Sequence, residues 1–155
     1  IKTKMMKNIL IAFTLVLLVA CNPTSNTKDY TEENEQEILT YLEDNNLAAT
    51  KSSTGLYYVI NSAGTGTQAT TTDNVTVAYK GYYTNGSVFD ESNSSGISFS
   101  LQQVIAGWTE GIAYFKEGGS GILLVPSSLA YGNSGRGSIP GGAVLVFDVK
   151  LISIN

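Results

Sequence analysis

Several side chains of this chain could act as nucleophiles or acids, but the residue that most often activates them is absent. The sequence contains no histidine, which removes the commonest general base and the commonest ligand of transition metals. Ser120 and Ser134 lie among glycines, but neither completes a G-x-S-x-G pattern. Asp90 and Glu91 are adjacent, so in a strand their carboxylates would point to opposite faces. Acyl transfer, metal-dependent hydrolysis and glycosidase chemistry therefore lack essential groups.

Sequence spacing and the cysteine count exclude two further kinds of site. Residues 64–69 match G-x-G-x-x-A, but they lead into TTTDN instead of a helix, so no dinucleotide site is expected. The single cysteine, Cys21, excludes an internal disulfide and a cysteine-based zinc site. We therefore expect neither metal nor cofactor, and any reaction should depend on shape and hydrogen bonds more than on proton transfer.

The only tryptophan lies in the stretch 104–115, VIAGWTEGIAYF, which predicts a short helix. Its apolar residues Trp108, Ile112 and Phe115 follow the i, i+4, i+7 spacing of one helix face. The glycine-rich run 118–121 should end this helix. Because so short a helix is marginal in isolation, its Trp108 face should pack against a sheet.

Most other apolar residues follow the two-residue period of β-strands. This alternation and one continuous apolar run predict strands near 56–60, 75–80, 88–90, 97–101, 122–125 and 145–151. Asn85-Gly86 predicts a type I′ hairpin. Ile97 and Phe99 should share one strand face. Since several strands accompany one short helix without βαβ alternation, the predicted fold class is α+β with an antiparallel sheet.

The first 20 residues predict a lipoprotein signal peptide. Lysines at three of the first seven positions precede a largely apolar run at 9–20, which is too short to span a bilayer. The ending Leu18-Val19-Ala20-Cys21 resembles the bacterial lipobox, which implies acylation of Cys21 and a lipid anchor in the membrane. The alternative is an unmodified, buried cysteine near a cleaved signal.

Three segments are expected after the signal: a tether at 21–30, an acidic helix with its connection at 31–52, and a domain at 53–155. Thr31 should cap the helix, which is predicted to run to about Asn46. Ile38, Tyr41 and Leu42 form a narrow apolar stripe, so the helix should pack only weakly on the domain. It could hold the domain off the membrane or bind a partner.

The charge balance argues against binding to nucleic acid. Three of the nine basic side chains lie in the first seven residues, whereas all 13 acidic ones come later, so removal of the signal would leave a net charge of −7. A protein this acidic, without a basic stripe, is also unsuited to electrostatic docking on anionic lipid.

Four motifs, in order and in spacing, resemble the FKBP-type peptidyl-prolyl isomerases. They are VAYKGYYTNGSVFDES (75–92), FSLQQVIAGWTEGI (99–112), VPSSLAYG (125–132) and IPGGAVLVFDVKL (139–151). The resemblance covers about Ser53 to Ile154, and 53–155 is therefore interpreted as an FKBP-type isomerase domain. It implies a twisted antiparallel sheet wrapped around one short helix, in agreement with the strand and helix pattern.

The resemblance also implies a peptide pocket. Trp108 would form its floor, the Ile105 N–H and the Tyr131 hydroxyl would bond carbonyls of the peptide, and Asp90 would lie beside the rotating imide. The walls and remaining contacts would come from Tyr79, Phe89, Phe99, Phe147, Val104 and Ile139. Ile97 is included in the wall because it shares a strand face with Phe99.

The activity implied by this pocket is peptidyl-prolyl cis–trans isomerisation, and the expected partners are proline-containing unfolded or partly folded polypeptides. The lipobox-like ending predicts a lipid-anchored location in a bacterial cell envelope, and we expect the protein to be a monomer. Macrolide inhibitors are possible ligands, although Arg136 and Ser138 stand where relatives often have apolar residues, and Gly141-Gly142 follow Pro140. A non-catalytic chaperone, a peptide-binding lipoprotein and a structural surface lipoprotein are the alternatives.

Overall fold

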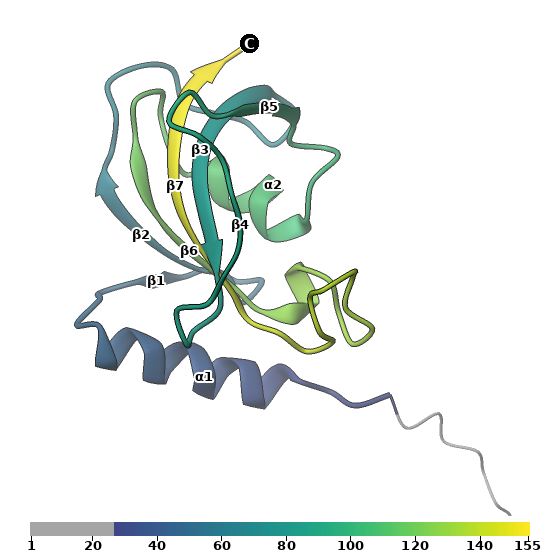
Figure 1. Ribbon diagram of the computed structural model, residues 1–155. Helices are drawn as coiled ribbons and strands as arrows, with labels where there is room; N and C mark the ends of the chain where they lie inside the picture. The colour runs from purple at the N-terminus through teal and green to yellow at the C-terminus, as the bar shows by residue number, and fades with distance from the viewer. Residues whose placement is uncertain (1–26) are drawn as a thin grey trace, which may run out of the picture.

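The computed structural model describes residues 27–155 (Figure 1). The predicted signal peptide at 1–20, the predicted lipidation site Cys21 and most of the predicted tether at 21–30 lie outside the described residues. Within 27–155, no helix is both long and apolar enough to cross a membrane.

An antiparallel sheet in the order β1-β2-β6-β7-β3-β4 forms the framework, with β5 beside β4 on the same edge of β3. This arrangement confirms the α+β class. The strands are β1 Thr50–Lys51, β2 Tyr57–Ser62, β3 Asn74–Tyr82, β4 Val88–Glu91, β5 Ile97–Ser100, β6 Ser120–Val125 and β7 Leu145–Ile154. Because β1 pairs with β2, the sheet begins a few residues before the predicted domain start at 53.

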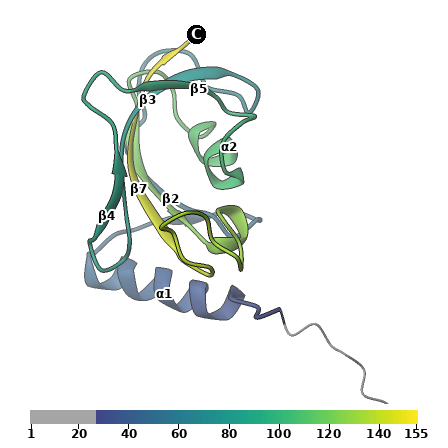
Figure 2. The same ribbon diagram turned by 45° about the vertical axis from the view of Figure 1, so that its right-hand side comes forward.

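The central strands β6 and β7 separate two apolar cores, because successive side chains point to opposite faces. Phe147 and Val149 belong to the core that contains Trp108. Val146 and Leu124 belong to a second core on the other face of the sheet. Figure 2 shows the sheet curving around α2 (Ala106–Ile112), while α1 (Thr31–Asp44) lies across one end of the sheet.

Helix α2 is shorter than the predicted 104–115, because it ends at Ile112. The chain turns there, and the Phe115 N–H donates to the Ile112 carbonyl over 3.0 Å. Phe115 is nevertheless fully buried in the same core as Trp108. The apolar spacing therefore identified the buried residues, although the last of them reaches the core from a turn.

Two glycines bring α2 close to β6. A Cβ on Gly107 would collide with the Val125 side chain, and one on Gly111 would lie 2.7 Å from Leu123 Cδ1. Glycine lowers helix stability by roughly 1 kcal/mol relative to alanine. Here its lack of a side chain allows the helix to lie directly on the strand, which holds Trp108 against the sheet.

The hairpin between β3 and β4 is not the predicted type I′ turn. A type I′ turn needs positive φ at both central residues, whereas Gly86 has φ 86° and Asn85 is not among the residues with positive φ. The Gly86 N–H donates to the Tyr83 carbonyl over 2.8 Å, and the Tyr83 N–H donates to the Ser87 carbonyl over 3.0 Å. The loop therefore has three residues, and Gly86 alone among them needs the left-handed conformation.

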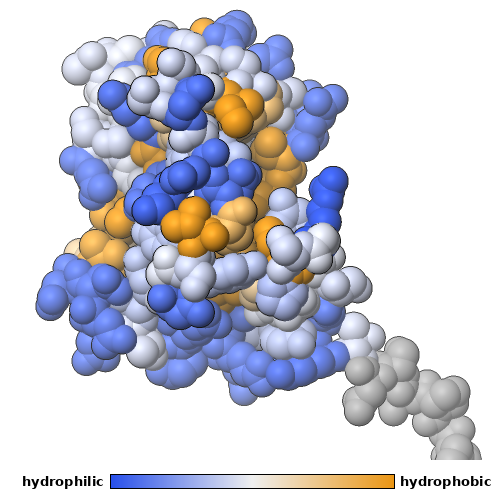
Figure 3. Space-filling model, in the orientation of Figure 1, coloured by the Kyte–Doolittle hydropathy of each residue, from blue (hydrophilic) through white to orange (hydrophobic). Residues whose placement is uncertain are grey.

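Helix α1 packs firmly on the sheet, so the predicted weak packing is wrong. Ile38 and Leu42 are 0% and 9% exposed and contact the second core beside Val146. The outward surface of α1 is hydrophilic (Figure 3). With its apolar stripe buried against its own sheet, the helix is part of the domain, so neither the spacer nor the partner-binding interpretation accounts for this stripe.

The ends of α1 also differ from the prediction. Tyr30, and not Thr31, is the N-cap residue, and the Thr31 N–H donates to the Asp29 carboxylate over 2.9 Å. The helix ends at Asp44, before Asn46, whose φ of 52° is left-handed. The Asp29 carboxylate satisfies a backbone donor of the first turn, as Thr31 was expected to do.

Shortening a buried side chain of α1 should destabilise the domain more than shortening the exposed side chain next to it. We expect Ile38→Ala to lower the free energy of unfolding by about 2–5 kcal/mol, because Ile38 is fully buried. Leu39→Ala should change it by about 0.5 kcal/mol or less, since Leu39 is 43% exposed. Urea denaturation of both variants measures the difference, and equal losses would show that α1 is not docked.

Candidate active site

A cavity of about 830 Å³ opens between α2, the strands β3–β5 and the segment that follows β6. Every predicted pocket residue except Ile97 lines it. The lining residues are Tyr79, Phe89, Asp90, Phe99, Gln103, Val104, Ile105, Ala106, Trp108, Ala130, Tyr131, Arg136, Gly137, Ser138, Ile139 and Phe147. Residues that are distant in the sequence thus meet on the side of the sheet that carries α2.

Trp108 lies at the centre of an aromatic cluster. Its ring centroid is 5.0 Å from that of Tyr79, 5.2 Å from that of Phe99 and 5.2 Å from that of Phe147. All three contacts are edge-to-face, the arrangement that aromatic quadrupoles favour. Its indole nitrogen is buried and has no hydrogen-bond partner within residues 27–155. Aromatic rings therefore form this part of the cavity.

A glycine in β3 allows the wall of the cavity to form. Phe89 and Phe147 meet edge-to-face with centroids 5.6 Å apart. A Cβ on Gly81 would lie 2.7 Å from the Phe89 ring and 2.9 Å from the Phe147 ring. Tyr83 supports the outer side of Phe89 at a centroid distance of 5.1 Å. The two phenylalanine rings are thus held against the backbone of β3.

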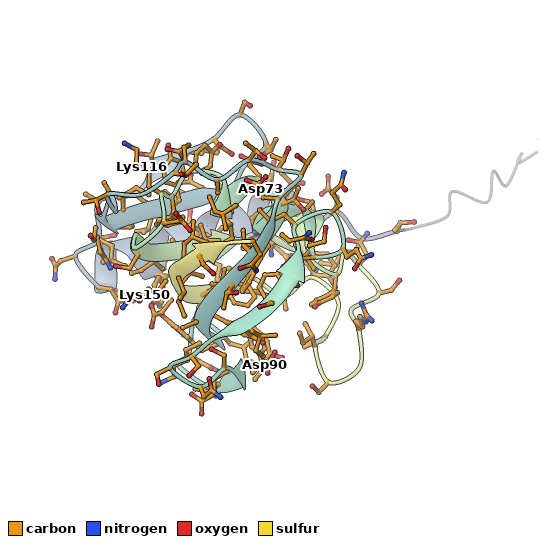
Figure 4. All side chains as sticks on the ribbon, turned by 90° about the horizontal axis from the view of Figure 1, so that it is seen from above. Asp73, Asp90, Lys116 and Lys150 are labelled. Atoms are coloured by element: carbon orange, nitrogen blue, oxygen red, sulfur yellow. The ribbon has the colours of Figure 1, made fainter. Side chains whose placement is uncertain are left out.

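Asp90 is oriented by a phenol, and no arginine or lysine forms a salt bridge with it among the described residues. The Tyr79 hydroxyl donates to Asp90 Oδ2 over 2.6 Å. Burial raises the pKa of Tyr79 above its ordinary value of 10.0, and this hydrogen bond makes the second-largest contribution. Figure 4 shows Asp90 on β4, on the opposite side of the molecule from Lys116. Asp90 is therefore a fixed, exposed acceptor at the rim.

Two donors at the cavity remain available to a ligand. Ile105 precedes α2 in an extended conformation, and its N–H donates to no acceptor within residues 27–155. Tyr131 follows the short helix η1 (Ser127–Leu129), and its hydroxyl forms no hydrogen bond within that same part of the chain. Both residues line the cavity, so two carbonyl groups of one bound molecule could be held there.

The remaining side of the cavity is a small, tightly turned loop. The Arg136 N–H donates to the Ile139 carbonyl over 2.9 Å, and the Ile139 N–H donates to the Arg136 carbonyl over 3.0 Å. Ile139 thereby reaches the cavity, as predicted. The Arg136 guanidinium lies 5.9 Å from the centroid of the Tyr131 ring. The loop adds a cation to a rim whose other charge is Asp90.

The prediction that Ile97 shares a wall with Phe99 is wrong. Ile97 is 47% exposed and does not line the cavity. It pairs with Val77 at the start of β5, which is an edge strand, whereas Phe99 pairs with Val75 and contacts the Trp108 ring. A shared strand face does not ensure a shared environment, because the cavity ends at Phe99.

The sequence interpretation missed four lining residues, Gln103, Ala106, Ala130 and Gly137. They are polar or small, and no periodicity distinguishes them from surface residues. It also missed the hydrogen bond between Tyr79 and Asp90, although both residues were predicted to lie in the pocket. Their positions on paired strands β3 and β4 could have suggested this contact.

Comparison with known proteins gives consistent results. Residues 65–152 match the model of the FKBP-type peptidyl-prolyl cis-trans isomerase family, which is more than half of the chain. The crystal structure of FkpA from Escherichia coli superimposes with a TM-score of 0.72 at 38% sequence identity, covering 84% of this chain and 63% of that one. An isomerase structure from Pseudomonas syringae has a TM-score of 0.70 at 28% identity, covering 83% of this chain and 98% of that one.

Curated bacterial relatives are similar but longer. The probable FkpA of Neisseria meningitidis is 50% identical over 103 residues, which are 64% of this chain and 38% of that protein. A probable FKBP-type isomerase of Haemophilus influenzae is 38% identical over 144 residues, which are 91% of this chain and 59% of that protein. This chain thus spans less than two thirds of either relative. With the family match and the shared fold, it belongs to the FKBP-type peptidyl-prolyl cis-trans isomerases.

Proposed function

We propose that this chain catalyses peptidyl-prolyl cis–trans isomerisation in polypeptides. The observation that carries the proposal is a cavity with an aromatic floor at Trp108 and two free donors, the Ile105 N–H and the Tyr131 hydroxyl. A proline ring fits an aromatic surface, and the carbonyls on either side of it need donors. The family membership and the names of the relatives support the same activity.

The apolar floor acts on the barrier by excluding water. Rotation about a peptide bond breaks amide resonance and meets a barrier of about 18–20 kcal/mol. The twisted transition state has lost its partial double bond, so its carbonyl is less polar than that of the planar ground state. Removal of water beside Trp108 and Phe89 therefore destabilises the planar form more than the twisted one.

The polar groups at the rim of the cavity lower the barrier further by holding the backbone of the bound peptide. Hydrogen bonds from Ile105 and Tyr131 to flanking carbonyls would keep the peptide bent around its imide bond. A thousandfold acceleration requires about 4 kcal/mol of differential stabilisation. Desolvation together with two hydrogen bonds can provide this without a general acid, a general base or a metal.

The proposed substrates are proline-containing segments of unfolded or partly folded chains, which can enter a cavity that is open to solvent. Macrolides are proposed as competing ligands of the same apolar floor. The rim loop presents the charged Arg136 and the polar Ser138, so their side chains would affect which macrolides and which residues beside proline are bound.

The activity can be tested with a protease-coupled assay on Ala-Xaa-Pro-Phe peptides. We expect Phe89→Ala to lower kcat/KM by about tenfold or more, because water then reaches the imide bond. Tyr114→Ala is the matched control, since Tyr114 is a 38% exposed aromatic residue that does not line the cavity. A wild-type chain that binds unfolded protein but accelerates no rotation would instead be a non-catalytic chaperone.

The rate should not depend on pH near neutrality. The raised pKa of Tyr79 keeps its phenol protonated up to and beyond pH 10. With no histidine in the sequence, we expect a flat profile of kcat/KM between about pH 6 and pH 9. The contribution of Tyr79 to stability is present below pH 10 and is lost as the pH rises further, because the unfolded chain releases the proton first. A bell-shaped profile in the neutral range would contradict this mechanism.

We further propose that the protein is anchored by lipid in a bacterial cell envelope. The support is the lipobox-like sequence Leu18-Val19-Ala20-Cys21 after an apolar run. Nine residues, 22–30, lie between Cys21 and the first residue of α1, so the domain could work close to the membrane surface. We propose that it does so as a monomer.

Expression of the full chain in a bacterial host tests the anchor. Mass spectrometry should find acyl groups on an N-terminal Cys21, and the protein should sediment with membranes. Cys21→Ser should remove the acyl mass and release the domain, because stable anchoring takes more than one acyl chain at this residue. An unmodified Cys21 in the wild-type protein would refute the anchor without affecting the proposed activity.

A further inference from the structure

The acidic helix α1 contains one buried polar residue. Asn34 is only 2% exposed, and both ends of its side-chain amide are satisfied. Its Nδ2 donates to the Gly142 carbonyl over 2.8 Å, and its Oδ1 accepts the Ser127 N–H over 2.8 Å. An apolar side chain would leave two buried backbone groups without partners, which is unfavourable.

These two partners are the ends of the segment 127–142, which forms one side of the cavity. The Gly132 N–H donates to the Ser127 carbonyl over 2.8 Å, and the Gly142 N–H donates to the Gly132 carbonyl over 2.9 Å. With the two bonds of Asn34, a closed ring of four hydrogen bonds connects α1 to the segment. Tyr131, whose hydroxyl is free to bind substrate, directly precedes one member of this ring.

Packing at the start of α1 strengthens the same connection. Gly142 has φ 77°, and a Cβ at this position would collide with the Tyr30 ring. Tyr30 therefore lies directly on the end of the segment. Figure 1 shows the N-terminal end of α1 beneath the segment 127–142, which is drawn in green and yellow.

We propose that Asn34 is a positioning residue of the isomerase site, which sets Tyr131 and Ile139 through the ring of hydrogen bonds. This inference rests on the proposed isomerase function. Helix α1 then does more than cover the second core, because it determines the position of the segment 127–142 relative to Trp108. The residue acts through the segment 127–142 and does not itself line the cavity.

Kinetics of three variants test the inference. We expect Asn34→Ala to lower kcat/KM by about tenfold, because a small displacement of a binding group is costly. Leu42→Ala is the matched control: it removes buried contacts from the same helix, but Leu42 has no bond to the segment. Its kcat/KM, corrected for the folded fraction, should change by about twofold or less. Equal losses of kcat/KM in both variants would show that Asn34 only stabilises the fold.

Asn34→Asp gives a reading that a purely structural role would not produce. Its carboxylate can accept the Ser127 N–H but repels the Gly142 carbonyl, whereas its protonated form can again donate to that carbonyl. We therefore expect kcat/KM of Asn34→Asp, relative to wild type at each pH, to recover as the pH falls below about 6. A pH-independent ratio would overturn the proposal.

Amide hydrogen exchange separates this inference from the proposed function. Asn34→Ala should accelerate the exchange of the Gly132 and Gly142 amides, while those of β6 and β7 stay protected. Unchanged exchange at both glycines would refute the ring of hydrogen bonds. An inactive wild-type protein would refute the isomerase function itself, whatever the exchange shows.

Discussion

The contact between α2 and β6 is the constraint on which the rest of the site depends. A seven-residue helix has little stability of its own, so it exists because it lies against the sheet. Gly107 and Gly111 permit this approach, since a Cβ at either position would strike Val125 or Leu123. The approach places the Trp108 ring within 5.2 Å of the Phe147 ring, and the remaining aromatic walls then surround a defined apolar surface.

Strand β7 lies between the aromatic surface of the cavity and helix α1, which carries Asn34. Phe147 faces the cavity, while its neighbour Val146 faces the core beneath α1, as the alternation of a strand requires. The helix that covers Val146 also carries Asn34, whose amide bonds both ends of the segment that bears Tyr131. The same helix therefore lies beneath the strand that carries Phe147 and bonds both ends of the segment that carries Tyr131.

The sequence predicted most of this arrangement where a regular period was present. Alternation along β7 identified its buried face, and the helical spacing of Trp108, Ile112 and Phe115 identified buried residues even though Phe115 lies beyond the helix. The ten cavity residues that were found came from the family motifs. The prediction for Ile97 was wrong because periodicity predicts which strand face a residue is on, but not how far the cavity extends along that face. Asn34 could not be found, because its importance lies in bonds to residues more than 90 positions away.

The solvent isotope effect on kcat/KM is the most direct test of whether the cavity lowers the barrier without moving a proton. If desolvation over Trp108 and hydrogen bonds to flanking carbonyls supply the acceleration, the rate in D2O should match the rate in H2O at equivalent pH, for wild type and for Asn34→Ala alike. A rate in D2O lower by about half or more would show proton transfer in the rate-limiting step, and would contradict isomerisation by shape and desolvation.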